Sequence, residues 1–172
     1  MKALMFRTAF ILCLFHATYL YASIWGEIEP LFNELKETHT KLILIHTQLK
    51  GITAISPTIA ESAILLSFKE QTEKASILIR YLAHGLSRWE EIEKRSNILL
   101  SCQFEAENLK LHMDNLTALL EFAAIAEKVI LSKSSLDLLS RYQDVLLSLN
   151  AILSKYGNLL NKTYKVNWQR VK

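Results

Sequence analysis

Residues 28–52 read IEPLFNELKETHTKLILIHTQLKGI, and the spacing of the apolar residues in this stretch decides the fold class. They recur every seven residues in two rows, Ile28, Leu35, Leu42 and Leu49, and Leu31, Ile45 and Ile52, with Thr38 as a polar member of the second row. Alternating steps of three and four residues place both rows on one face of a helix. The stretch therefore predicts a helix from about Glu27 to Lys50 with coiled-coil-like packing, ended by Gly51.

A second helix is expected to begin after Ser56-Pro57. Proline is tolerated in the first helical turn, and the Thr58-x-x-Glu61 pattern suits a capping box, in which a threonine hydroxyl and a glutamate carboxylate bond reciprocally to backbone N–H groups. Apolar residues then share one face as far as His84, and Gly85 is expected to end the helix.

A third helix is predicted from Ser87-x-x-Glu90 to about Leu131, which makes it more than forty residues long. Its apolar residues keep one heptad register throughout, with Cys102, Leu109, Leu116, Ala123 and Ile130 in one row. A break at Asp114-Asn115 is the alternative, because both residues are good helix caps. The unchanged register favours a continuous helix.

The last helix is expected to start near Ser134-x-x-Asp137. Its rows are Leu139, Leu146, Leu153 and Leu160, with Tyr142, Leu149 and Tyr156. The 172 residues contain 4 Gly and 2 Pro, which suits a few long helices with short loops better than a many-stranded sheet. The sequence therefore predicts an all-α, up-and-down bundle of about four long helices over residues 23–164.

Residues 1–22 have the pattern of a secretory signal peptide. Lys2 and Arg7 give a positive start, residues 9–15 (AFILCLF) are apolar, and Ala22 offers a cleavage point. The fit is imperfect because Leu20 stands where signal peptides prefer a small residue. An uncleaved anchor and a buried N-terminal helix remain as alternatives. A cleaved signal implies an exported protein, periplasmic or extracellular.

The net charge and the cysteine content indicate which kinds of exported protein this chain resembles least. Losing Lys2 and Arg7 with the signal lowers the formal net charge from +3 to +1, which removes the main argument for nucleic-acid binding. Cys102 is then the sole cysteine, so no intrachain disulfide forms, and its apolar row suggests an inert core residue. Small secreted animal proteins usually carry disulfides, so a bacterial source is favoured.

No catalytic or cofactor motif is present in the sequence. HExxH, GxSxG, Walker and GxGxxG patterns are missing, and no histidine stands three residues after a glutamate as a di-iron bundle requires. We therefore expect no enzyme activity, no cofactor, no metal and no small-molecule substrate. Asn115-Leu116-Thr117 and Asn161-Lys162-Thr163 match the glycosylation pattern, which matters only for a eukaryotic or viral source.

Candidate interaction residues come from tryptophans, from the wide apolar stripe of the last helix and from the basic end of the chain. They are Trp25, Trp89, Leu138, Val145, Leu147, Ile152, Lys165, Trp168 and Arg170. The alternative for the apolar members is burial in the core. Residues 165–172 are expected to form a frayed basic tail, either solubilising or docking on a membrane or an acidic partner.

The leading hypothesis is a non-enzymatic exported helical protein that acts through protein–protein interaction. Such a protein would be an assembly subunit of an envelope, secretion or conjugation apparatus, an adaptor or an exported factor. One alternative is a secreted four-helix, cytokine-like signalling factor, against which the missing disulfides count. Another is an amphipathic bundle that binds lipid membranes.

Overall fold

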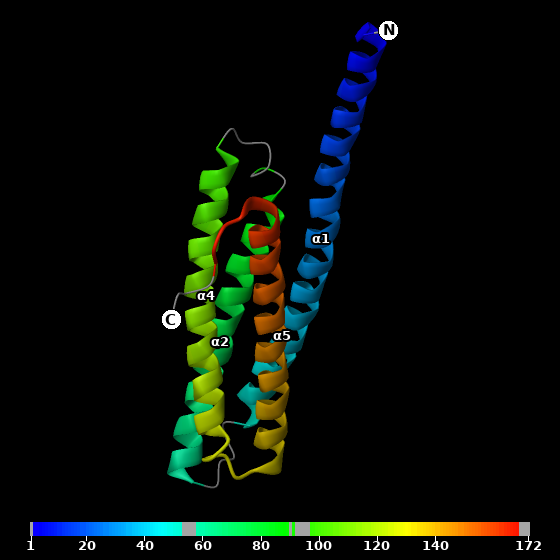
Figure 1. Ribbon diagram of the computed structural model, residues 1–172. Helices are drawn as coiled ribbons and strands as arrows, with labels where there is room; N and C mark the ends of the chain where they lie inside the picture. Colours follow the sequence, from blue (N-terminus) through cyan, green and yellow to red (C-terminus); the bar gives the residue numbers. More distant parts are fainter. Residues whose placement is uncertain (1, 53–57, 90, 92–96, 169–172) are drawn as a thin grey trace.

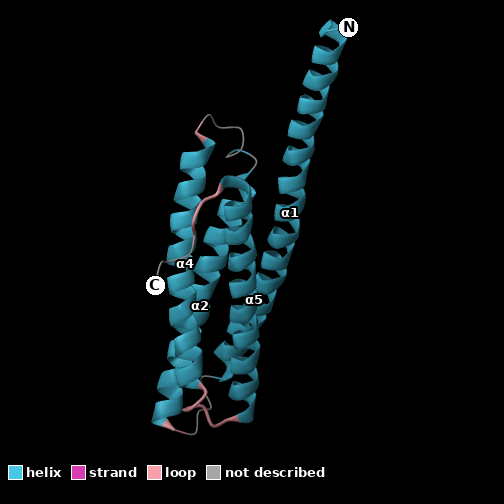
Figure 2. Cartoon of the chain, viewed as in Figure 1, coloured by secondary structure: helices cyan, strands magenta, loops and turns pink. Residues whose placement is uncertain are grey.

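The computed structural model describes residues 2–52, 58–89, 91 and 97–168. This part of the chain forms four helices and no strand (Figures 1 and 2). The helices are α1 (Lys2–Ile52), α2 (Ile59–Ser87), α4 (Ile98–Ala126) and α5 (Lys133–Tyr164). The predicted all-α fold class is therefore confirmed for the described residues.

The four helices pack side by side, and each runs antiparallel to the one before it (Figure 1). α1 packs against α2 and α5, and α4 packs against the same two helices from the opposite side. A weaker diagonal contact joins α2 to α5, so α5 touches all three other helices. The N-terminal part of α1 extends beyond the end of the bundle (Figure 1).

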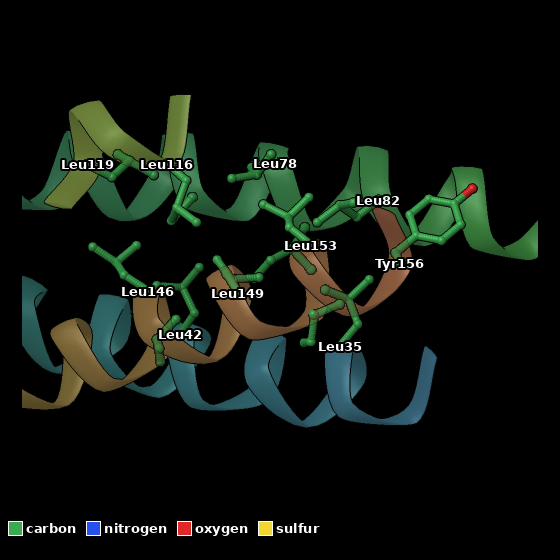
Figure 3. Close-up of a cluster of buried hydrophobic side chains, with 14 of the residues drawn as sticks. Leu35, Leu42, Leu78, Leu82, Leu116, Leu119, Leu146, Leu149, Leu153 and Tyr156 are labelled. Carbon is green, nitrogen blue, oxygen red and sulfur yellow. The ribbon is translucent and has the colours of Figure 1, made fainter. Parts of the chain in front are cut away.

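Both predicted apolar rows of α1 face the core. All their members from Ile28 to Leu49 are buried, including Thr38, whose hydroxyl donates to the Glu34 carbonyl at 2.8 Å. The two rows of α5 are buried over their whole length. Figure 3 shows Leu146, Leu149 and Leu153 of α5 between the side chains of α1 and those of α2 and α4.

The predicted third helix is correct in its middle and wrong at both ends. α4 runs unbroken through Asp114-Asn115 but covers only Ile98–Ala126. Ser87 is not a cap for it: this residue ends α2, and its hydroxyl donates to the His84 carbonyl at 3.0 Å. Ile130 is buried although it lies outside α4, directly after the turn at residues 127–129, so its heptad position predicts its burial but not its secondary structure.

Other helix boundaries also differ from the expected ones. α2 continues to Ser87, beyond Gly85, and the hydroxyl that caps α5 belongs to Ser132, which accepts the Ser135 N–H at 3.3 Å. α1 is longer than the predicted helix because it begins at Lys2. The Ser56-Pro57 start signal lies outside the described residues.

The segment after α5 is packed as far as Trp168, although a frayed tail was expected from residue 165; residues 169–172 of that predicted tail lie outside the described part of the chain. Lys165 adopts the left-handed conformation (φ 58°), and its N–H donates to the Asn161 carbonyl at 2.9 Å. The chain then turns back beside α4 (red in Figure 1). Val166 and Trp168 are buried, with exposed fractions of 8% and 7%.

The indole ring of Trp168 packs directly against the backbone of Gly157. A methyl group on Gly157 would overlap the indole ring of Trp168. We expect Gly157→Ala to destabilise the protein by about 1 kcal/mol, because displacing a buried aromatic ring outweighs the helix propensity gained. In a Trp168→Ala background the same change should stabilise by about 0.5–1 kcal/mol. Urea denaturation of the four proteins tests this reversal; the same sign in both backgrounds would contradict the packing.

Candidate binding groove

A groove of about 760 Å³ lies along the seam between α2 and α4. One rim consists of α2 residues and the residue that directly follows this helix: Lys74, Ile77, Tyr81, His84 and Arg88. The other rim consists of α4 residues: Phe104, Asn108, Leu111, Asn115 and Ala118. Each rim spans fourteen positions, which at 1.5 Å per residue is about 21 Å, or four helical turns. α2 and α4 are in less extensive contact than the other neighbouring helices, which leaves room for the groove.

Large apolar side chains stand exposed on both rims. Ile77 and Tyr81 of α2 are 44% and 62% exposed, and Phe104 and Leu111 of α4 are 66% and 56% exposed. Single exposed apolar residues are ordinary on protein surfaces. Four that line one groove form a patch of the kind that marks ligand or protein contact.

The floor of the groove holds a partly buried carboxyl group. Glu105 accepts a hydrogen bond from the hydroxyl of Tyr156 at 3.4 Å, and Tyr156 is itself 1% exposed. Burial raises the pKa of Glu105, while the Tyr156 hydrogen bond, Arg88 and His84 oppose this. Burial, followed by the Glu105 charge, also raises the pKa of Tyr156, which keeps that hydroxyl a hydrogen-bond donor.

A stacked pair bridges the two rims. The rings of Tyr81 and His112 lie 6.3 Å apart between centroids, with 25° between their planes. Burial lowers the pKa of His112, so the neutral ring is favoured in the folded protein. A neutral imidazole against a phenol extends the apolar surface of the groove across the seam.

The raised pKa of Glu105 makes the stability of the protein depend on pH. Above its ordinary value of 4.5, the folded state retains a proton that the unfolded chain has lost, so the free energy of unfolding falls as pH rises through this window. We expect Glu105→Gln, which keeps an acceptor for Tyr156, to be more stable than the unchanged protein at pH 7. The difference should shrink below about pH 4.5.

Urea denaturation of both proteins between pH 4 and pH 7 measures this difference directly. All other titrating groups are shared, so their contributions cancel in the comparison. A Glu105→Gln protein that is less stable at pH 7 would show that the Tyr156 hydrogen bond outweighs the burial of the charge.

The structure places most of the sequence-predicted interaction residues in the core. Trp89 is fully buried, with its ring edge-on to Tyr156 and Tyr164 at 5.9 and 5.7 Å. The others that are buried are Leu138, Val145, Ile152 and Trp168. The wide stripe of α5 thus serves its contacts with three helices, which was the alternative interpretation.

Two of the predicted interaction residues remain on the surface. Leu147 is 58% exposed, and Lys165 is exposed at the turn after α5. Trp25 and Arg170 lie outside the part of the molecule whose side chains the structure describes. Leu147 and Lys165 do not line a common pocket. Lys165 lines a surface pocket beside the N-terminal end of α4.

Sequence reasoning missed the groove residues, although a signal for them exists. Tyr81, Phe104 and Leu111 are large and apolar but fall outside the heptad rows that predict the core. Such residues have no assigned place in the interior and are candidates for a surface site. Which of them share a groove depends on which helices are neighbours, and that is not visible in the sequence.

Two further histidines, His39 and His46, lie between α1 and α2 and not at the groove. His46 Nδ1 lies 2.8 Å from the Thr72 hydroxyl and His39 Nε2 lies 3.3 Å from the Ser76 hydroxyl, so both join α1 to α2. Among the described residues no group of three potential metal ligands occurs. Within the same residues, no helix is both long and apolar enough to cross a bilayer.

Comparison of the chain with protein-family models, with curated proteins and with solved structures finds no match.

Proposed function

We propose that this chain is a non-enzymatic exported helical protein that acts through protein–protein interaction, and that the α2–α4 groove is its docking site. The observation that carries the proposal is the convergence of four exposed apolar side chains, from two helices, on one groove. Grooves of this kind bind the apolar face of a partner helix. The length of about four turns is sufficient for the i, i+3, i+4 and i+7 contacts that such a helix makes.

The composition of the groove supports binding. The exposed groups that line its rims are mainly apolar, amide or imidazole side chains, which suit packing and hydrogen bonding with a protein surface. Aromatic residues such as Tyr81 and Phe104 are enriched where protein interfaces gain most of their affinity. Tyr156, which lines the groove, is buried and packs edge-on against the buried Trp89 behind it.

A photo-crosslinking amino acid at Phe104 tests the docking site in the cells that make the protein. We expect a discrete adduct with a protein from position 104 and none from Leu147, which is similarly exposed on α5. Light scattering of the purified protein then shows whether the adduct is a second copy of the chain. Adducts with lipid alone, or equal adducts at both positions, would contradict the proposal.

Export rests on the signal-like residues 1–22 and has a separate test. Mass spectrometry of the protein recovered outside the cytoplasm should show a mature chain that begins at Ser23, after cleavage at Ala22. A full-length chain that stays in the cytoplasm would contradict export and leave the docking groove untouched.

A further inference from the structure

We infer that the partner segment is an amphipathic helix with acidic residues along one flank and an uncharged opposite flank. This inference rests on the proposed function and specifies the chemistry of the partner. It follows from a difference in charge between the two rims of the groove.

The α2 rim carries a cationic side chain at each end. Lys74 stands at one end and Arg88 at the other, with His84 one turn from Arg88. Fourteen positions separate Lys74 from Arg88, so the two charges lie about 21 Å apart along the groove. Arg88 has a weak surface contact with Glu91 at 3.9 Å, and its charge also lowers the pKa of the partly buried Glu105. The guanidinium is partly exposed and has five N–H donors, so it can also reach a carboxylate on a partner.

The α4 rim carries no charge along the same length. Along this rim the exposed apolar side chains of Phe104 and Leu111 alternate with the amides of Asn108, which is half-buried, and Asn115, which is exposed. The only acid among the lining residues that the structure describes is Glu105, which lies in the floor and not on a rim.

A helix that lies along the groove therefore meets different chemistry on its two sides. Its apolar face packs against Ile77, Tyr81 and Leu111, and carboxylates on the α2 side lie within reach of Lys74 and Arg88. Complementary charges at the edge of an interface determine the partner, the orientation and the association rate more than the affinity. Because only one rim is charged, an acidic flank also determines which way round the partner helix lies.

A displayed library of eighteen-residue helical peptides provides a probe without a known partner. Leucine is fixed at the i, i+3, i+4, i+7 positions, and the flanking positions vary among Glu, Lys, Gln and Ser. The library is selected on the purified protein, and each retained peptide is checked for lost binding to Phe104→Asp. We expect retained peptides to carry glutamate on one flank and to bind more weakly as salt is raised.

Charge reversal provides the matched comparison. Lys74→Glu with Arg88→Glu should weaken the acidic peptides about tenfold or more and should select lysine-flanked peptides instead. Lys41→Glu with Lys128→Glu changes the net charge equally at exposed positions that do not line the groove and should leave the affinity unchanged. Peptides that need Phe104 but show no acidic flank would overturn this inference alone. If no peptide depends on Phe104, the docking groove itself is overturned.

Discussion

Phe68→Ala is expected to lower the free energy of unfolding by about 3–5 kcal/mol, because it removes the side chain that joins three helices. Phe68 of α2 is fully buried. The centroid of its ring lies 5.1 Å from that of Tyr142 in α5 and 6.3 Å from that of Phe122 in α4. The cavity left by the ring has rigid helices on all sides and cannot close easily.

The expected loss is a large part of the 5–15 kcal/mol that stabilises a typical domain. For a protein of this size it corresponds to a fall in Tm of about 10 °C. Leu66→Ala is the matched control, because Leu66 lies two residues away on the same helix and is 57% exposed. Its effect should stay within about 0.5 kcal/mol. Equal effects of the two changes in thermal and urea denaturation would show that α2, α4 and α5 do not meet at Phe68.

The predicted core of α1 and α5 is confirmed because burial in a bundle follows directly from sequence spacing. Ile28, Leu35 and Leu42 are buried because residues seven positions apart lie on the same face of a helix, and this face of α1 packs against the bundle. The seven-residue pattern does not distinguish a helix from a buried turn, however. Ile130 meets the requirement for an apolar side chain at the end of the bundle while its backbone is turning toward α5.

The ends of the helices were harder to predict, because hydroxyl groups compete for the same capping role. Ser87 and Ser134 each stand three residues before an acid, as a cap does, but Ser132 caps α5 and Ser87 bonds back to its own helix. Local sequence offers several equivalent choices. Contacts between distant segments then decide among them.

The groove depends entirely on such distant contacts. Tyr81 and His112 stack because α2 and α4 are neighbours, and Glu105 meets Tyr156 because α5 lies behind them. The tail differs for a similar reason: Val166 and Trp168 lack a helical period, but Gly157 gives the Trp168 ring a place to pack. Periodicity predicts which face of a helix is buried and says little about what lies beside it.

Glu61 also makes contacts that its local sequence does not predict, and replacing it is the second change for which we expect a large loss of stability. The predicted capping box is half correct: the Thr58 hydroxyl accepts the Glu61 N–H at 3.1 Å. The Glu61 carboxylate does not return to Thr58. It is fully buried, and its Oε1 accepts the N–H groups of Leu131 and Ser132 at 3.3 and 3.0 Å, seventy positions along the chain. Glu61 thus fixes the turn that leads into α5 against the start of α2.

Glu61→Ala is expected to cost about 2–3 kcal/mol, because hydrogen bonds to a carboxylate are lost and the two N–H groups at the turn lose their acceptor. Glu61→Gln should cost less than half of this, since its amide oxygen can replace Oε1. The second carboxylate oxygen of Glu61, Oε2, is buried and has no hydrogen-bond partner among the described residues. Replacing it by the NH2 group of glutamine therefore breaks no hydrogen bond at that position. Urea denaturation of the two variants measures both costs.

Glu70→Ala provides the comparison for charge and helix propensity, because Glu70 is exposed on the same helix. It should change stability by no more than about 0.5 kcal/mol. Hydrogen exchange adds a local measurement. The amides of Leu131 and Ser132 should exchange faster in Glu61→Ala, whereas exchange in the middle of α5 should change only as much as the global stability of the protein does. Unchanged exchange at the turn in a destabilised Glu61→Ala protein would place the loss elsewhere in the core and contradict the role of Glu61 as the link between α2 and α5.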